Sequence, residues 1–284
     1  MLTMRKAFAG LAAGLMAMTA GAALAATHAP ELEPVDFSFQ GPFGKFDRGA
    51  LQRGYKVYAE VCSSCHSMNL VYFRNLAQKG GPFYDEKYPN PNDSPYAKAL
   101  AAAVMVPDID QETGDAIQRP ATPADHFKAP FPNDAAARAS NGGALPPDLS
   151  VIARAREGGA TYLYHFLTGF HAPPAGLRVP PGQNYNVYFA GDLASYWSGP
   201  KDKVPHGGLV AMPPQLTPDR VSFDDGTKAT PQQMAHDVAT FLEWAAEPKA
   251  EERKQTGLAV MIYLLLLTGV LYLSYRRIWK NVAH

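Results

Sequence analysis

Cysteine is almost absent from this chain, which has two cysteines, Cys62 and Cys65, in 284 residues. A structural zinc site takes four ligands, and with no second cysteine pair that class does not fit. Net charge is also absent, because 26 basic residues balance 26 acidic ones. No overall field therefore argues for nucleic acid, and a charged partner has to recognise a local patch. We find no internal repeat.

Long apolar runs are confined to the two ends of the chain. At the N-terminus, Arg5 and Lys6 precede an apolar stretch from Phe8 to Leu24, and Ala23-Leu24-Ala25 forms a small-x-small cleavage site. We predict a cleaved signal peptide over residues 1–25 and an exported domain over 26–253. An uncleaved anchor is the alternative, and the small residues of the run and the polar sequence after it argue against that.

The second apolar run has the length of a membrane span. Thr256 to Tyr275 are twenty residues without a charge, and at 1.5 Å per residue such a helix crosses a ~30 Å hydrocarbon core. Three basic residues follow it: Arg276, Arg277 and Lys280. We therefore predict a transmembrane helix over 254–276 and a cytoplasmic tail over 277–284. The exported domain then lies on the periplasmic side of the inner membrane.

The exported domain is predicted to be mainly α-helical, with long irregular connections between its helices. Asp47 and Thr230 have the positions of helix N-caps, and prolines mark two helix ends. The expected helices are 46–61, 97–106, 149–155, 160–170 and 231–247, and the expected long loop is 173–214.

One motif carries recognisable chemistry, the sequence Cys62-Ser63-Ser64-Cys65-His66. C-x-x-C-H is the attachment signature of c-type haem: two thiols form thioethers with the haem vinyl groups, and the next residue ligates the iron. Thioredoxin-like redox pairs occur within a βαβ unit, whereas this motif lies at the end of a predicted helix. A plain disulfide would leave the adjacent histidine unexplained. We therefore predict one covalently bound haem c.

The second axial ligand is predicted to be a methionine in a loop. We exclude the methionines in the signal peptide, in the membrane span and next to His66. Three methionines remain: Met105, Met212 and Met234. Met212 precedes two prolines that restrict its backbone, while the other two lie at helix ends, where methionine is often core filler. Histidine is the competing ligand, and His206 leads a set that also holds His28, His126, His165, His171 and His236. Six-coordinate iron has no open site, so electron transfer is favoured over catalysis at the haem.

One segment is strongly acidic and has two interpretations. Between residues 85 and 115 two lysines face seven acidic residues, Asp85, Glu86, Asp93, Asp108, Asp110, Glu112 and Asp115. Such a run is commonly a solvated loop. The functional interpretation is a docking surface for a basic soluble partner.

Longer motifs resemble a known family. They are Asn141 to Ser150 with Ala153 to Arg156, Ala211 to Pro214, Phe223 to Thr227, and Phe241 to Pro248. In this order, over nearly all of the mature chain, they resemble cytochrome c1, the haem subunit of ubiquinol–cytochrome c reductase (bc1) complexes. The resemblance implies a class I cytochrome c-like haem domain with long insertions, whose first and last helices cross and frame the haem.

The resemblance also implies residue roles and partners. Cys62 and Cys65 would be the thioether links and His66 and Met212 the axial ligands, with haem-pocket roles for Asn141, Pro147, Arg156, Tyr162 and Phe189, of which Arg156 pairs a propionate. Implied partners are cytochrome b, the Rieske iron–sulfur protein as electron donor and a soluble cytochrome c as acceptor. No independent catalytic site is expected.

The chain departs from the family pattern at one place. Residues Asp192 to Pro205 look like an insertion compared with the shorter mitochondrial members of the family. Some bacterial relatives carry a second cysteine pair there, and this chain has none. The conformation of this loop therefore does not follow from the family. Two alternatives remain: an anchored cytochrome c donating to an oxidase or reaction centre, and a haem enzyme such as a peroxidase.

Overall fold

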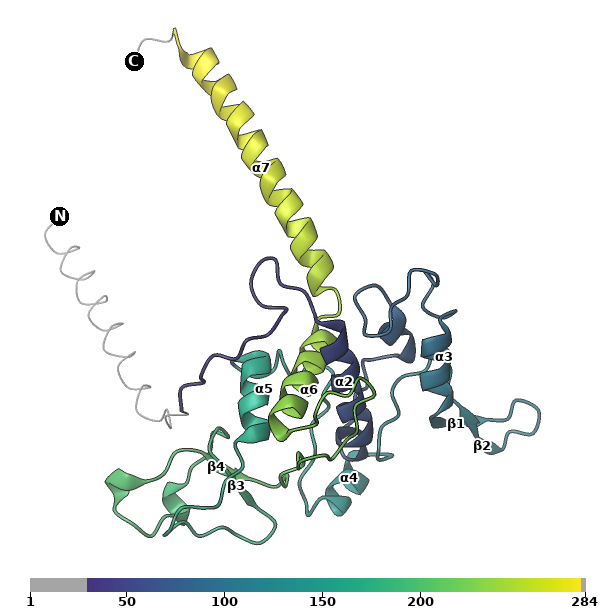
Figure 1. The fold of residues 1–284 in the computed structure, drawn as a ribbon, viewed down its shortest axis with the longest axis vertical. Helices are drawn as coiled ribbons and strands as arrows, with labels where there is room; N and C mark the ends of the chain where they lie inside the picture. Colours follow the sequence, from purple (N-terminus) through teal and green to yellow (C-terminus); the bar gives the residue numbers. More distant parts are fainter. Residues whose placement is uncertain (1–29, 282–284) are drawn as a thin grey trace, which may run out of the picture. The chain divides into compact units, whose positions relative to one another are not determined.

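The computed structural model describes residues 30–281, so the predicted signal peptide lies outside the described residues. Within them the chain is mainly helical, with six α-helices and four short strands (Figure 1). It divides into two compact units, one containing residues 32–168 and the chain from 211 onward, the other containing 169–210. The prediction of a mainly α fold with long connections is confirmed.

Two helices far apart in the sequence form the centre of the larger unit. Helix α2 (Arg48–Glu60) begins at Asp47, whose carboxylate accepts from the Ala50 amide, as predicted. Helix α6 (Pro231–Ala246) begins at Thr230, whose hydroxyl accepts from the Gln233 amide at 3.1 Å. The two helices pack closely against each other.

The apolar core lies along this pair of helices. Helix α5 (Gly159–Thr168), close to its predicted bounds, covers the other side of α6. Phe241 and Trp244 of α6 are fully buried, with ring centroids 5.5 Å apart, and Leu51 and Val57 of α2 are fully buried as well. Burial of side chains of this size provides most of the stabilisation that such a helix pair receives, about 1.5–3 kcal/mol for each.

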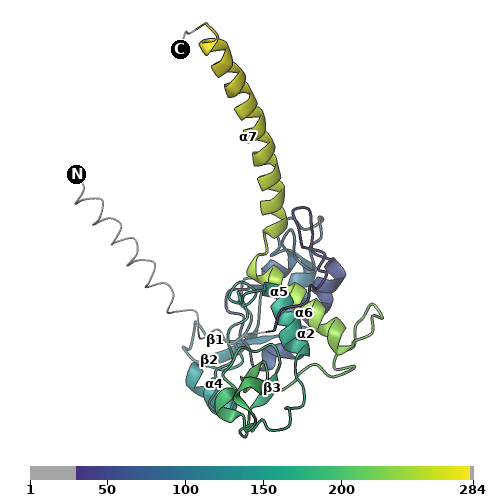
Figure 2. The ribbon, with the colours of Figure 1, turned by 90° about the vertical axis from the view of Figure 1, so that its left-hand side faces the viewer.

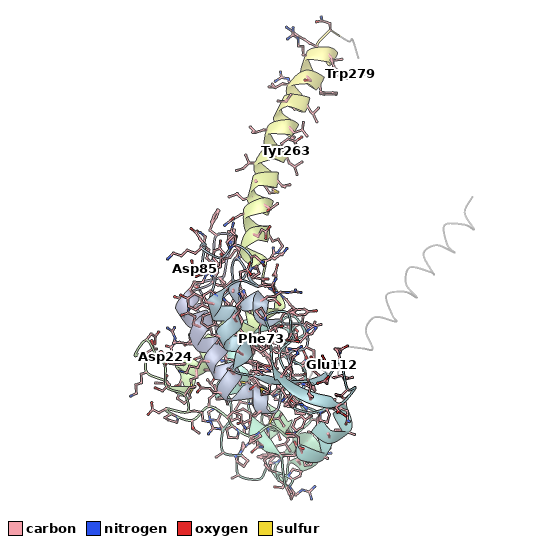
Figure 3. All side chains as sticks on the ribbon, turned by 90° about the vertical axis from the view of Figure 1, so that its right-hand side faces the viewer. Phe73, Asp85, Glu112, Asp224, Tyr263 and Trp279 are labelled. Carbon is pink, nitrogen blue, oxygen red and sulfur yellow. The ribbon has the colours of Figure 1, made fainter. Side chains whose placement is uncertain are left out.

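The helix predicted over 97–106 is wrong in its second half. Helix α3 covers Pro95–Ala102, and strand β1 (Met105–Ile109) follows and pairs antiparallel with β2 (Ala116–Pro120). Val106 precedes Pro107, which disfavours helical backbone at that step. Pairing with β2 then fixes the extended form, and Glu112 lies in the connection between the two strands (Figure 3).

The short helix predicted over 149–155 is also wrong, because this segment is a series of turns after helix α4 (Asp134–Ser140). The Ser150 amide donates to the Asp148 carboxylate at 2.8 Å. Such local side-chain bonds compete with the helical hydrogen-bond ladder and favour turns.

The smaller unit contains most of the long loop predicted over 173–214, with two short strands in it, and residues 211–214 of that loop belong to the larger unit. β3 (Asn184–Asn186) pairs antiparallel with β4 (Gly208–Val210). Within this unit the loop from Asp192 to Pro205 has two single 3-10 turns, Ala194–Tyr196 and Lys201–Lys203. Leu177, Tyr185 and Leu193 form a separate small apolar cluster. The extra loop therefore folds around apolar contacts of its own.

The last helix, α7 (Ala250–Trp279), is long and apolar enough to cross a membrane (Figure 2). Its most apolar 18-residue window has a mean hydropathy of 2.1, and none of it is buried in the protein. Tyr263 and Trp279 project from its surface (Figure 3). A fully exposed apolar helix of this kind requires a bilayer or a protein partner around it.

Candidate haem site

The C-x-x-C-H motif forms one rigid turn directly after α2. Cys62–Ser64 is a 3-10 turn, and the Cys62 carbonyl accepts from the amides of Cys65 (3.1 Å) and His66 (2.9 Å). Both cysteines are free thiols and partly buried. Two thiols and an imidazole therefore emerge from a single turn, which is the arrangement that attachment to two vinyl groups and one axial position requires.

The imidazole of His66 is held in one tautomer. Its Nδ1 lies 2.8 Å from the carbonyl oxygen of Pro147. A carbonyl can only accept, so Nδ1 carries the proton and Nε2 keeps its lone pair. Burial lowers the pKa of His66, which keeps the ring neutral. A neutral imidazole oriented through its second nitrogen is the form that ligates metals.

The environment of Cys62 argues against a redox-active thiol pair. Burial raises the pKa of the Cys62 thiol to about 12, so it is protonated at neutral pH. Reactive cysteines of thioredoxin-like proteins need a lowered pKa instead. The described part of the chain also holds no group of three or more His, Cys, Asp or Glu side chains that could bind a metal ion.

A clamp missed by the sequence reasoning holds the segment that orients His66. The Asp148 carboxylate accepts from the Ser67 hydroxyl and the Asn69 amide, each at 2.8 Å. The Leu149 amide donates to the Ser67 carbonyl at 2.9 Å. These bonds attach residues 147–150 to the chain just after the motif. Asp148 followed two residues later by Ser150 is a spacing typical of an Asx turn, which predicts the local turn but not the contacts with Ser67 and Asn69.

The pocket residues implied by the family resemblance have different surroundings. Asn141 caps α4 and its side chain donates to the Ala137 carbonyl at 2.7 Å. Exposed Arg156 lies beside Tyr162: burial raises the pKa of Tyr162, and the Arg156 guanidinium opposes that rise. Phe189 lies in the smaller unit, where its amide donates to the Asn186 side chain at 3.1 Å. Arg156 and Tyr162 are thus brought together.

Among the candidate methionines, Met212 is the one in a loop position and partly exposed. Met234 is fully buried in the core face of α6, and Met105 lies on the exposed hairpin strand β1. The sulfur of a methionine ligand has to be accessible to the iron, so it cannot be buried among the side chains of the apolar core. The surroundings of the three methionines therefore favour Met212.

Three of the candidate histidines have structural partners. His165 is buried with Nε2 2.8 Å from the Glu33 carbonyl, and His236 has Nε2 3.0 Å from the Asp36 carbonyl. The ring of His126 lies 3.8 Å from that of Tyr72. These contacts hold the three rings against other parts of the fold.

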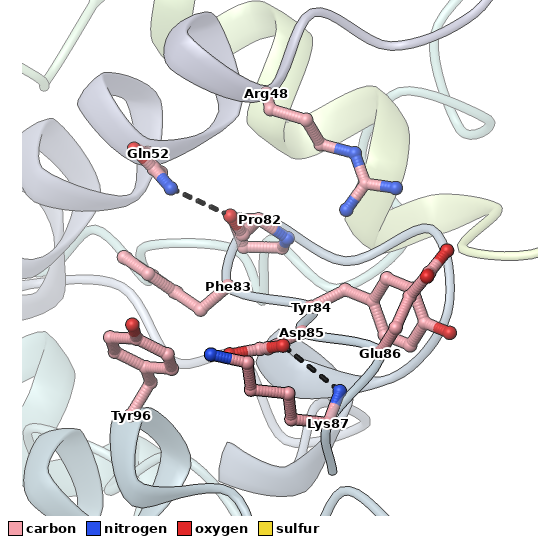
Figure 4. A pocket seen from close by; sticks show the side chains of 9 residues that line it. All are labelled: Arg48, Gln52, Pro82, Phe83, Tyr84, Asp85, Glu86, Lys87 and Tyr96. Atoms are coloured by element: carbon pink, nitrogen blue, oxygen red, sulfur yellow. Dashed lines mark hydrogen bonds between the residues drawn. The ribbon is translucent and has the colours of Figure 1, made fainter. Parts of the chain in front are cut away.

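A pocket of about 760 Å³ lies elsewhere in the larger unit and contains none of the motif residues. Its lining carries both signs of charge: Arg48 and Lys87 are basic, and Asp85 and Glu86 are acidic (Figure 4). Two of the acidic residues of segment 85–115 thus have cationic neighbours. The pocket is no part of the candidate haem site.

The helix pair, the C-x-x-C-H turn at the end of α2 and the apolar helix α7 define a c-type cytochrome domain with a helix able to anchor it in a membrane. Residues 37–282 match the model of the Cytochrome C1 family. The chain therefore belongs to the cytochrome c1 family, the haem subunits of bc1 complexes.

Curated relatives agree with this family. Cytochrome c1 of Rhodospirillum rubrum is 41% identical over 96% of this chain and 97% of its own length. The mitochondrial cytochrome c1 heme protein of Saccharomyces cerevisiae is 42% identical over 87% of this chain and 72% of its own length. A cytochrome b/c1 of Bradyrhizobium diazoefficiens is 41% identical over 86% of this chain, which spans only 35% of that longer protein.

Proposed function

We propose that this chain carries one haem c and passes single electrons from a Rieske iron–sulfur protein to a soluble cytochrome c, in a complex with cytochrome b. The observation that carries the proposal is the 2.8 Å contact between His66 Nδ1 and the Pro147 carbonyl, next to two free thiols on the same turn. It prepares His66 Nε2 as a metal ligand before any cofactor is bound.

The residues have separate roles in this proposal. Cys62 and Cys65 form the thioether links, and His66 and Met212 are the axial ligands. Arg156 and Tyr162, which lie together, bind a propionate, and Asn141, Pro147 and Phe189 belong to the pocket. When bound, the haem supplies a one-electron couple, whose potential is raised by histidine–methionine ligation. The chain needs no acid–base group for this and has no independent catalytic site.

We place the haem domain on the periplasmic side of an inner membrane, with α7 as its span. The unburied apolar surface of α7 supports the span, and the basic residues Arg276, Arg277 and Lys280 support a cytoplasmic C-terminus. The predicted export signal supports the same orientation.

The docking surface for the acceptor is proposed at the tip of the β1–β2 hairpin. Within segment 85–115, Asp108 pairs with Arg119 at 2.5 Å, and Asp93 lies 4.0 Å from Lys98. Asp85 and Glu86 line the pocket of mixed charge. The acidic residues left for a basic partner are Asp110, Glu112 and Asp115, at the end of the hairpin.

A pyridine haemochrome spectrum of the membrane-extracted complex, with its ratio of b to c haem, tests the proposal. We expect one haem c in this chain and co-purification with a cytochrome b and a Rieske protein. Haem c without those partners would instead favour an anchored donor to an oxidase or reaction centre. Binding of carbon monoxide or cyanide by the reduced protein would indicate an open haem site and an enzyme.

A further inference from the structure

An exposed aromatic residue lies in a short loop before α2. Phe43 is 74% exposed, whereas its neighbours Phe37 and Phe46 are buried. The ring of Phe39 lies 5.1 Å from that of Phe37 and 5.0 Å from that of Phe46, so the base of the loop is packed. Phe43 alone of these phenylalanines is outside the packed cluster, and solvent exposure of a whole phenylalanine ring is unfavourable.

The loop is tied to the first turns of α7 (Figure 1). The Lys254 ammonium donates to the carbonyls of Phe39 (2.5 Å) and Gly44 (3.2 Å). The Glu251 carboxylate accepts from the Phe46 amide at 2.9 Å. The loop is therefore held against α7 at both of its ends, by two charged residues that precede the apolar run.

The position of these bonds sets the height of Phe43 along α7. The uncharged run begins at Thr256, two residues after Lys254, which corresponds to about 3 Å along the helix axis. Phe43 is the neighbour of Gly44, one of the two residues that Lys254 binds. Phe43 therefore lies within the reach of a lysine side chain from the level where α7 passes from polar to apolar sequence, which is the membrane–water boundary if α7 spans the bilayer.

We propose that the loop 40–45 enters the headgroup region of the bilayer, with Phe43 as an apolar anchor beside α7. Exposed Lys45, two residues further, can reach lipid phosphates from the same loop. The occupant is lipid rather than protein, because one aromatic ring offers at most ~200 Å², far less than the ~800 Å² that each partner buries in a stable protein interface. The inference rests on the proposed membrane span.

Such a contact gives the haem domain a second point of attachment to the membrane. A single helix leaves the domain free to tilt and rotate, and interfacial anchors are among the features that fix tilt and rotation. With Phe43 and α7 both in the bilayer, the face of the domain that points away from the membrane is defined.

Spin labels at single introduced cysteines test the inference. The variants are Phe43→Cys, Ile109→Cys on the exposed strand β1 (58% exposed) and Leu265→Cys in the span (69% exposed). The complete complex is placed in vesicles of phosphatidylcholine and phosphatidylglycerol. Collision rates are measured with oxygen, which concentrates in the bilayer, and with a water-soluble nickel chelate. The unsubstituted chain gives the background from Cys62 and Cys65.

We expect the label at Phe43 to collide with nickel several-fold less than the label at Ile109, and with oxygen at a rate between those at Ile109 and Leu265. Collision rates equal to those at Ile109 would place the loop in water and overturn the inference. Protection from both reagents would show a protein neighbour and also overturn it. A label at Leu265 that nickel reaches freely would overturn the span itself, so the two failures are distinguishable.

Discussion

Gly54 on α2 lies directly against the backbone of Asp237 on α6, so that a β-carbon at Gly54 would stand 2.0 Å from the Asp237 carbonyl oxygen. The two helices therefore cross at a position where one of them has no side chain. The preceding residue, Arg53, binds the fully buried Asp237 carboxylate through Nε at 2.7 Å. Contact and ion pair together fix the angle of the helix that leads into the Cys62 turn.

Gly54→Ala is predicted to destabilise the domain by about 1–3 kcal/mol, because the added methyl meets backbone that cannot move aside. The matched control is Gly49→Ala in the same helix, where a β-carbon would stand 3.2 Å from Asp47 Oδ1 and Arg53 Nη1, side-chain atoms that need to shift by only a few tenths of an ångström. There we expect a smaller effect than at Gly54, because helix propensity favours alanine by up to ~1 kcal/mol and offsets that shift. Denaturant unfolding measures the change in the free energy of unfolding for each variant. Equal changes would contradict the close contact between Gly54 of α2 and Asp237 of α6.

Met212→Leu is predicted to abolish the low-spin histidine–methionine spectrum and to lower the midpoint potential. Axial ligands set haem potentials over a range of ~0.8 V, and we expect a fall of at least a tenth of that range. Met105→Leu, on the exposed hairpin, should leave both unchanged. Redox titration with visible spectroscopy measures the midpoint potential and the haem spectrum of each variant. An unaltered potential in Met212→Leu would assign the ligand to another residue.

Neutralising the hairpin tip is predicted to slow reduction of the soluble cytochrome c several-fold at low salt and to weaken its salt dependence. The variant is Asp110→Asn, Glu112→Gln and Asp115→Asn together. The asparagine introduced at position 110 can still accept the amide bonds from positions 112 and 113 that hold the turn. The control neutralises three exposed acids elsewhere: Asp202, Asp219 and Glu252. Equal behaviour of the two variants would identify the tip as a solvated turn.

Stability is predicted to decrease with rising pH through the titration of His236. The Asp237 carboxylate, 3.6 Å away, raises the pKa of His236 above its ordinary 6.5. A pKa raised on folding stabilises the folded state fully below pH 6.5, and this contribution is lost as pH rises through the folded value. The stability difference between the unsubstituted chain and His236→Gln, measured by thermal unfolding, should therefore shrink as pH rises from about 5.5 to about 9. The same difference for His171→Gln, at an exposed site, should not show this trend.

The parts of the fold that depend on neighbouring residues were predictable. The helices at Asp47 and Thr230 begin where their capping side chains predict, because the bonds reach only three residues ahead. The extent of α3 was not predictable from its own sequence. Its end depends on the pairing of Val106 with Arg119, thirteen residues further along the chain.

The clamp around Asp148 escaped prediction for the same reason. Its carboxylate binds Ser67 and Asn69, about eighty residues earlier in the chain, so no local pattern shows the contact. That attachment and the local bond from the Ser150 amide to Asp148 both favour the turns over 149–155, whereas periodicity alone indicates a helix there.

The sequence by itself determined the chemistry available to this protein: the C-x-x-C-H spacing, the loop methionine Met212 and an apolar run long enough to cross a bilayer. These are local patterns, set by bonds between near neighbours and by composition. Only the tertiary structure decided how His66 is prepared, because the Pro147 carbonyl that selects its tautomer lies 81 residues away. The same holds for Phe43, whose height beside α7 depends on bonds to Lys254 more than two hundred residues later.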